Sequence, residues 1–207
     1  GFRCETTYTV TGSGLIVIDV HGVPEGKPPA MLPKIGLQLE LPGDAERVEW
    51  YGRGPGENYS DSKQAGKFGV YEMTVDELFT PYVYPQENGN RTDVRWVSAT
   101  DGAGIGLLAT GAPTLEFSAR RYTDRDLEAA KHESDLAPRE FITLNLDYRQ
   151  NGLGSNSCGP AQLPPYAVGS EEFRFRILLA PYLAGDHAPE RLSRRMAAEA
   201  AQWMKGE

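Results

Sequence analysis

The chain has 207 residues, of which 40% are hydrophobic and 24% are charged, and its formal net charge is −8. A single all-β domain of this length contains enough apolar residues for a proper core. The acidic balance argues against a nucleic-acid or anionic-membrane partner, because no basic block is there to neutralise phosphates, and no apolar run is long enough to span a bilayer.

The first residue is Gly1 and not Met, and a strand-like pattern begins almost at once. We therefore expect the chain to be a piece of a longer protein, so that the lack of a signal peptide carries no information. The two cysteines, Cys4 and Cys158, do not indicate a disulfide framework.

Alternation of apolar and polar residues dominates the chain and predicts β-strands. Turn-forming stretches rich in Gly and Pro separate these runs, so we expect antiparallel pairing and an all-β sandwich. The polar positions indicate sheets with one face in solvent or packed on another domain. The predicted strands cover residues 14–20, 34–41, 47–52, 104–110, 114–122, 141–148 and 172–179.

Three helical stretches interrupt the strands. Thr74 and Glu77 form a T-x-x-E capping box before a single turn, and Thr123 is the expected N-cap of a short second helix. Residues 188–205 form the longest predicted helix, an appendage after the last strand. Its apolar stripe consists of Leu192, Met196, Ala200 and Trp203.

Metal and phosphate sites are not indicated. His21, His132 and His187 are scattered without ligand spacing, and there is no CxxC or HExxH motif. The stretch "GRGPGEN" at 52–58 lacks the GK[ST] ending of a phosphate loop and is interpreted as a structured loop.

Two polar loops remain as candidates for binding. In "QNGLGSNSCGP" at 150–160, glycines free the backbone to approach a ligand closely, although a wide turn explains the same composition. The stretch "YPQENGNR" at 84–91 offers the donors and acceptors that hydroxyl-rich ligands require, with ring faces from Tyr82, Tyr84 and Trp96. The alternative is a buried polar network that pins this loop to the sheet, with Glu87 paired to Arg91.

Glycoside hydrolysis needs two carboxyl groups that flank the bond. Glu57, Glu87 and Asp147 are candidates by type, but nothing in the sequence shows that any two of them converge. An aldose epimerase would need a histidine acid beside a carboxylate base, for which Glu87 and His132 are the pair to consider. A free-standing carbohydrate-binding module is the third alternative, motivated by the polar and aromatic cluster from Tyr82 to Trp96.

In chain order, these stretches resemble the C-terminal, small-chain domain of the large bacterial β-galactosidases of glycoside hydrolase family 2. The resemblance implies a large antiparallel supersandwich related to the galactose-mutarotase fold. The segments that carry it are "LPKIGLQLELPGDAERVEWYGRGPGENYSDS", "ELFTPYVYPQENGNRTDVRW", "LEFSARRYT" and "LNLDYRQNGLGSNSCGP".

The resemblance also implies that the chemistry lies elsewhere. In that family a separate (β/α)8 barrel carries the two catalytic glutamates with Mg²⁺ and Na⁺ sites, and it hydrolyses terminal β-D-galactosides such as lactose with retention. This chain would then contain no catalytic residue and no cofactor. Its expected partners are the barrel domain, the galactoside and a second copy of the chain, and its expected compartment is the bacterial cytoplasm.

This domain would cover the aglycone side of the active site. The best-known member of the family carries a Trp platform where this chain has Cys158, and a thiol cannot stack, so the acceptor subsite should be wider. The "ENGNR" stretch either contacts the substrate or supports the loop that does. A role in support and at a domain interface is favoured over direct contact with the substrate. The residues expected on this side are Glu87, Asn88, Asn90, Arg91, Asn156, Ser157 and Cys158.

The resemblance extends to about Tyr182, which divides the chain into a sandwich domain at 1–185 and a helical tail at 186–207. The family domain usually has further strands before the position of Gly1, so we expect the sandwich to be truncated at its N-terminus. A partner chain or a second copy would cover the edge that this leaves.

Overall fold

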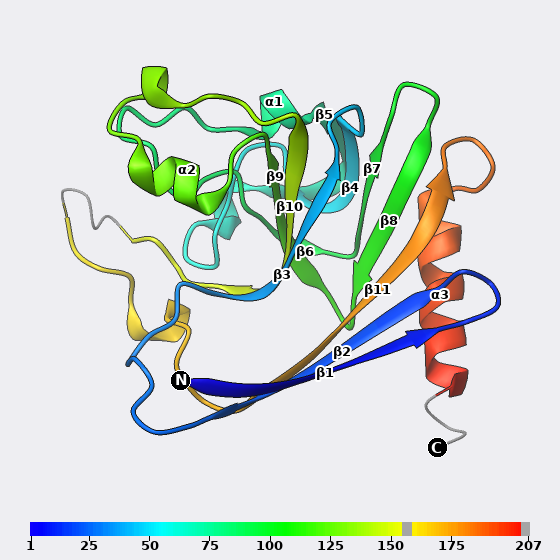
Figure 1. Ribbon diagram of the computed structural model, residues 1–207, viewed down its shortest axis with the longest axis horizontal. Helices are drawn as coiled ribbons and strands as arrows, with labels where there is room; N and C mark the ends of the chain where they lie inside the picture. Colours follow the sequence, from blue (N-terminus) through cyan, green and yellow to red (C-terminus); the bar gives the residue numbers. More distant parts are fainter. Residues whose placement is uncertain (155–158, 204–207) are drawn as a thin grey trace.

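The computed structural model describes residues 1–154 and 159–203, and within them the chain forms two antiparallel sheets with short helices and one longer helix (Figure 1). The predicted all-β sandwich is confirmed. The larger sheet has the order β1 (Phe2–Val10), β2 (Ile16–Pro24), β11 (Phe173–Leu183), β8 (Ile105–Gly111), β7 (Trp96–Thr100), β4 (Arg47–Gly54), β5 (Lys67–Thr74). The smaller sheet has the order β3 (Lys34–Pro42), β10 (Phe141–Gln150), β9 (Leu115–Arg120), β6 (Arg91–Val94).

The core lies between the inner faces of the two sheets. Ile142, Leu144 and Leu146 of β10 are buried there at every second position, as strand geometry requires. Across the gap, the Trp50 ring of β4 meets the Phe117 ring of β9 edge-on, with 5.6 Å between the ring centroids. Burial of such large side chains on both sheets holds the sandwich closed.

The other face of the smaller sheet differs from the prediction. Thr143, Asn145 and Asp147 of β10 alternate with the core residues, yet they are also buried. The expectation that polar faces meet solvent or another domain is therefore wrong for this strand. Segments of the same chain fold over this face and bond the neighbouring strand β9, through Asn90 to Glu116 and Glu87 to Arg120, so β10 has one apolar and one polar buried face.

The short helices lie where the sequence predicts them. Helix α1 (Val75–Leu78) begins with the Thr74–Glu77 capping box, and α2 (Asp124–Ala129) has Thr123 as its N-cap. Single 3-10 turns occur at Lys63–Ala65, Glu133–Asp135 and Pro164–Tyr166. No helix among residues 1–154 and 159–203 is long and apolar enough to cross a membrane.

Helix α3 (Pro189–Trp203) packs on the outer face of the larger sheet, away from the core (Figure 1). Leu192, Met196 and Ala200 of the predicted stripe are buried there, while the Trp203 side chain lies outside what the structure describes. The helix covers sheet residues that would otherwise face water. They are Leu15, Val17, Trp96, Leu108, Leu178, Ala180 and Tyr182.

One end of the larger sheet remains uncovered on its inner face. Tyr8 and Val10 pair with core-facing positions of β2, yet they are 65% and 69% exposed. Ile105 and Leu183 pair with each other at the ends of β8 and β11 and are exposed as well. Together with the partly buried Ile16, these residues form what we call the apolar shelf.

Candidate functional site

Polar side chains cover the outer face of the smaller sheet, and we call them the polar layer. They alternate with core residues along β9 and β10. The pairs that stand opposite each other are Glu116 with Asp147, Ser118 with Asn145, and Arg120 with Thr143. Because buried polar groups require hydrogen-bond partners, other segments have to supply them.

The predicted stretch at 84–91 lies on this layer. The Asn90 side-chain nitrogen donates to the Glu116 carboxylate at 2.8 Å and to the Asn58 carbonyl at 3.0 Å. Arg120 Nη1 donates to Glu87 Oε1 at 3.2 Å. The stretch therefore joins the smaller sheet through side chains that point inward.

Gly89 makes the turn in this stretch possible. Its φ of +76° lies in the left-handed region, and a Cβ atom there would stand 2.9 Å from the Leu78 carbonyl oxygen. The Gly89 N–H donates to Glu57 Oε2 at 2.8 Å, and the Asn88 side-chain oxygen accepts from the Thr80 N–H at 3.1 Å. These contacts fix the loop from both sides.

Arg91 ties the same loop to the core of the domain. Its guanidinium donates to the carbonyls of Gly89 at 2.7 Å, Pro55 at 2.9 Å and Leu78 at 3.1 Å, and it lies over the Trp50 ring. Burial lowers the pKa of Arg91 to about 10. The predicted ion pair between Glu87 and Arg91 is absent from the described contacts, because Arg91 bonds carbonyls instead.

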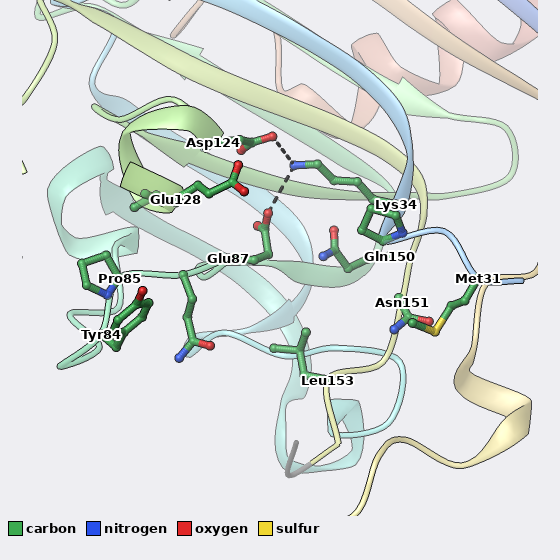
Figure 2. Close-up of a pocket in the computed structure, with 13 residues that line it drawn as sticks. Met31, Lys34, Tyr84, Pro85, Glu87, Asp124, Glu128, Gln150, Asn151 and Leu153 are labelled. Carbon is green, nitrogen blue, oxygen red and sulfur yellow. Dashed lines mark hydrogen bonds and ion pairs between the residues drawn. The ribbon is translucent and has the colours of Figure 1, made fainter. Parts of the chain in front are cut away.

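Glu87 belongs to a cluster of ion pairs at the rim of the layer. Lys34 Nζ lies 3.3 Å from a Glu87 oxygen and 3.3 Å from an Asp124 oxygen (Figure 2). Arg120 lies beneath them and pairs with both Glu87 and Asp124. The cluster joins β3, the 84–91 stretch, β9 and the start of α2.

Two carboxyl groups of the polar layer have raised pKa values. Burial raises the pKa of Glu116 to about 7, although Asn90 donates to it. Burial raises the pKa of Asp147 to about 8, against the attraction of Lys34. Gly36 on β3 leaves the room for Asp147, since a Cβ there would overlap the carboxylate. At neutral pH Asp147 is therefore mostly protonated and able to donate a hydrogen bond.

A cavity of about 560 Å³ opens beside the ion pairs. Figure 2 shows that α2, the 84–91 stretch and the chain that follows β10 surround it. Its wall combines charged, amide and apolar groups, as is typical of ligand pockets. The lining residues are Met31, Pro33, Lys34, Tyr84, Pro85, Gln86, Glu87, Asp124, Leu127, Glu128, Gln150, Asn151 and Leu153.

The predicted binding residues occupy different places. Glu87 lines the cavity, whereas Asn88, Asn90 and Arg91 are buried with their side chains bonded to the protein. Their favoured role, support of the loop and of a domain interface, stays a prediction. Three further predicted residues lie outside the described part of the chain: Asn156, Ser157 and Cys158.

The aromatic residues do not form one platform. Trp96 is 2% exposed beneath α3, on the far face of the larger sheet, so the expectation that it offers a ring to a ligand here is wrong. The Tyr82 hydroxyl bonds Glu57, and Tyr84 is exposed at the rim of the cavity. Trp96 belongs to a strand whose outer face is apolar, which its neighbours in sequence do not reveal.

Groups suited to a metal or to an acid–base pair are not brought together. Within residues 1–154 and 159–203, no cluster of three His, Cys, Asp or Glu side chains is placed to hold a metal ion. His132 is exposed and does not line the cavity that contains Glu87. His21 pairs instead with Glu172, 2.7 Å away on the outside of the larger sheet.

Lys34 and Asp124 were not predicted as site residues, and Gln150 was predicted only as the first residue of the candidate loop at 150–160. Lys34 and Gln150 are cross-strand partners at the ends of β3 and β10, and Asp124 is the first residue of α2. Their positions depend on strand register and helix placement, for which no local motif exists. A predicted pairing of β3 with β10 would have placed Lys34 beside Gln150.

Comparison with known proteins gives a consistent result. A family model described as beta galactosidase small chain matches residues 1–179. The β-galactosidase of Priestia megaterium is 37% identical over 162 residues, which are 78% of this chain and 16% of that protein. The Photobacterium profundum β-galactosidase is 34% identical over 84% of this chain and 16% of its own length, and the Kluyveromyces lactis β-galactosidase 32% over 87% and 17%.

Proposed function

The chain belongs to the β-galactosidase small-chain family, and from this premise we propose that it is the non-catalytic C-terminal domain of an enzyme that hydrolyses terminal β-D-galactosides such as lactose. The chain spans only 16–17% of the length of the relatives it matches, and this observation carries the proposal. The larger remainder would hold the catalytic barrel with its Mg²⁺ and Na⁺ sites, in the bacterial cytoplasm. Residues 1–185 would form the domain and 186–207 an appended tail.

The carboxyl groups of the chain support a non-catalytic role. A retaining glycosidase needs one carboxylate free to attack the sugar and a second carboxyl to protonate the leaving group. Glu57 is held by the Gly89 N–H, Glu87 is paired with Lys34, and Asp147 is buried and mostly protonated at neutral pH. Each of these groups already serves the fold.

We place the aglycone side of the active site at the 84–91 stretch and the loop that contains Asn156, Ser157 and Cys158. Glu87, Tyr84 and Leu153 line one cavity, and Leu153 stands shortly before that loop in sequence. Asn88, Asn90 and Arg91 would hold the rim in position from behind. A small side chain at Cys158 would leave the acceptor subsite wide.

The apolar shelf is the proposed contact with the rest of the enzyme. Exposed apolar residues of this extent on a core-facing surface are typical of a surface that another element covers. The edge strand β1 also offers unpaired backbone groups beside the shelf, which suit a further strand or a second copy of the chain. Val10→Asp should then prevent assembly, whereas Val83→Asp, at a more exposed valine on the 79–90 segment, should not.

A hybrid enzyme tests the proposal. The Priestia megaterium β-galactosidase, with its matching region replaced by this chain, should hydrolyse o-nitrophenyl β-D-galactoside, and the same enzyme lacking that region should be inactive or nearly so. The 207-residue chain by itself should show no hydrolysis. Hydrolysis by the chain alone at a rate near that of the full enzyme would contradict the proposal.

A further inference from the structure

The side chain of Gln150 has no hydrogen bond within the described part of the chain. Gln150 is the last residue of β10, is 4% exposed, and lines the cavity beside the polar layer. Its buried Oε1 lacks a partner among the described residues, and no donor bond from its amide nitrogen is formed there either. An unsatisfied buried amide costs free energy, so its persistence in a pocket points to a ligand that satisfies it.

The position of Gln150 in the cavity wall makes it distinct, because the other described amides with an unpartnered buried oxygen, Asn90 and Gln162, do not line this cavity. The Asn151 side chain accepts from the Val168 N–H at 3.0 Å and donates to the Gly152 carbonyl at 2.9 Å. The Gln38 side chain donates to Asn145 across the strands at 2.9 Å. Gln150 is therefore the described amide that combines an unpartnered buried oxygen with a place in the cavity wall.

The surroundings of Gln150 indicate the ligand. Figure 2 shows its amide in the cavity with Lys34 and Glu87, whose mutual ion pair leaves further donor and acceptor capacity. Glu128 adds a carboxylate on the opposite rim that has no partner among the described residues, and Leu127 and Leu153 add apolar surface. A free amide presents one acceptor beside one donor, which matches two adjacent hydroxyl groups, and apolar walls match a C–H face.

We propose that Gln150 is the specificity-determining residue of a site for a polyhydroxylated ring, a sugar or cyclic polyol, whose adjacent hydroxyls bond its amide oxygen and nitrogen. Glu128 accepts from a third hydroxyl at the rim. This site deepens the proposed function, and it rests on that function only for the choice of sugars as ligands. Every residue of the site belongs to this chain.

Titration of the ¹⁵N-labelled 207-residue chain with D-glucose, D-galactose and myo-inositol, followed by NMR, tests the site. Shifts should concentrate at residues 34, 87, 128 and 150. Gln150→Leu should weaken binding about tenfold or more through the loss of two hydrogen bonds. Its melting temperature should stay equal or rise, since the change removes an unsatisfied buried acceptor. A purely structural amide would lower the melting temperature instead.

Matched variants complete the test. Gln202→Leu, on exposed α3, should bind like the parent chain, and Glu128→Ala, an exposed rim change, should weaken binding without unfolding. No shift at the cavity with any of the three probes, or unchanged binding in Glu128→Ala and Gln150→Leu, would overturn the inference. An active hybrid enzyme together with that negative result would remove this site and leave the domain assignment intact.

Discussion

Replacing Asp147 by Asn should stabilise the domain at neutral and alkaline pH. Asp147 is 3% exposed in the polar layer, and burial raises its pKa from 3.8 to about 8. Between these two values the folded chain holds a proton that the unfolded chain has released. Stability rises with pH only where the unfolded state binds more protons, so here the free energy of unfolding falls as pH rises.

The size of this effect follows from the shift. Each pH unit between the two pKa values costs about 1.4 kcal/mol, which amounts to something on the order of 5 kcal/mol between about pH 4 and pH 8. Asn has the same shape and does not ionise, so the variant escapes this loss. Burial raises the pKa of Glu116 to about 7, and this residue is present in both proteins. The free energy of unfolding of the variant should therefore still fall as pH rises, but less steeply.

Urea unfolding at a series of pH values measures the prediction. The two proteins should be equally stable near the acid end, and the advantage of Asp147→Asn should widen steadily toward pH 8. Asp44→Asn, a change at an exposed residue, should follow the parent chain throughout. Parallel pH profiles for the parent chain and Asp147→Asn would refute the reasoning, because Asp147 would then be ionised in the folded state.

Further outcomes follow from the same contacts. Gly89→Ala should lower the free energy of unfolding by about 1–3 kcal/mol, because φ is +76° and the Leu78 carbonyl oxygen stands where Cβ would go; urea unfolding would show it. Arg91→Leu should cost about 3–5 kcal/mol by leaving buried carbonyls without donors, and an unchanged transition midpoint would contradict this. Truncation after Gly185 should cost about 4 kcal/mol by removing the buried face of α3, measured as a lower melting temperature with added dye binding. In the hybrid enzyme, Cys158→Trp should lower KM for substrates with glucose or aryl aglycones. An unchanged acceptor preference would mean that the loop containing Cys158 does not line the active site.

Alternation predicted the strands whose two faces differ in polarity. It located β3, β9, β10 and β11 because each presents apolar residues to the core at every second position. It did not identify β7, Trp96–Thr100, since α3 covers the outer face and every residue of that strand is buried. A strand buried on both faces loses the period that sequence analysis relies on.

The candidate site was predicted only where its residues are adjacent in sequence. The polar stretch at 84–91 stood out because its amides, acid and arginine are consecutive, and one of the two interpretations, a buried network, describes Asn90 and Arg91. Lys34 was missed, and Gln150 was included only as the start of the loop at 150–160, because strand register, a long-range property, makes the two residues neighbours. The polar residues of β10 also predicted a face in solvent or on another domain, whereas segments of the same chain cover that face.

The position of β11 in the larger sheet has a consequence for biosynthesis. Ile177 pairs with Ile18 on one side and Gly111 on the other, so this last strand joins the β1–β2 hairpin to the rest of the sheet. While the ribosome is still making the earlier strands, β2 and β8 present open edges to other nascent chains. A chain whose translation stops before Phe173 would thus have a larger sheet in two separate parts, each with an open edge prone to aggregation. Synthesis through Leu183 is required before β11 can join these parts.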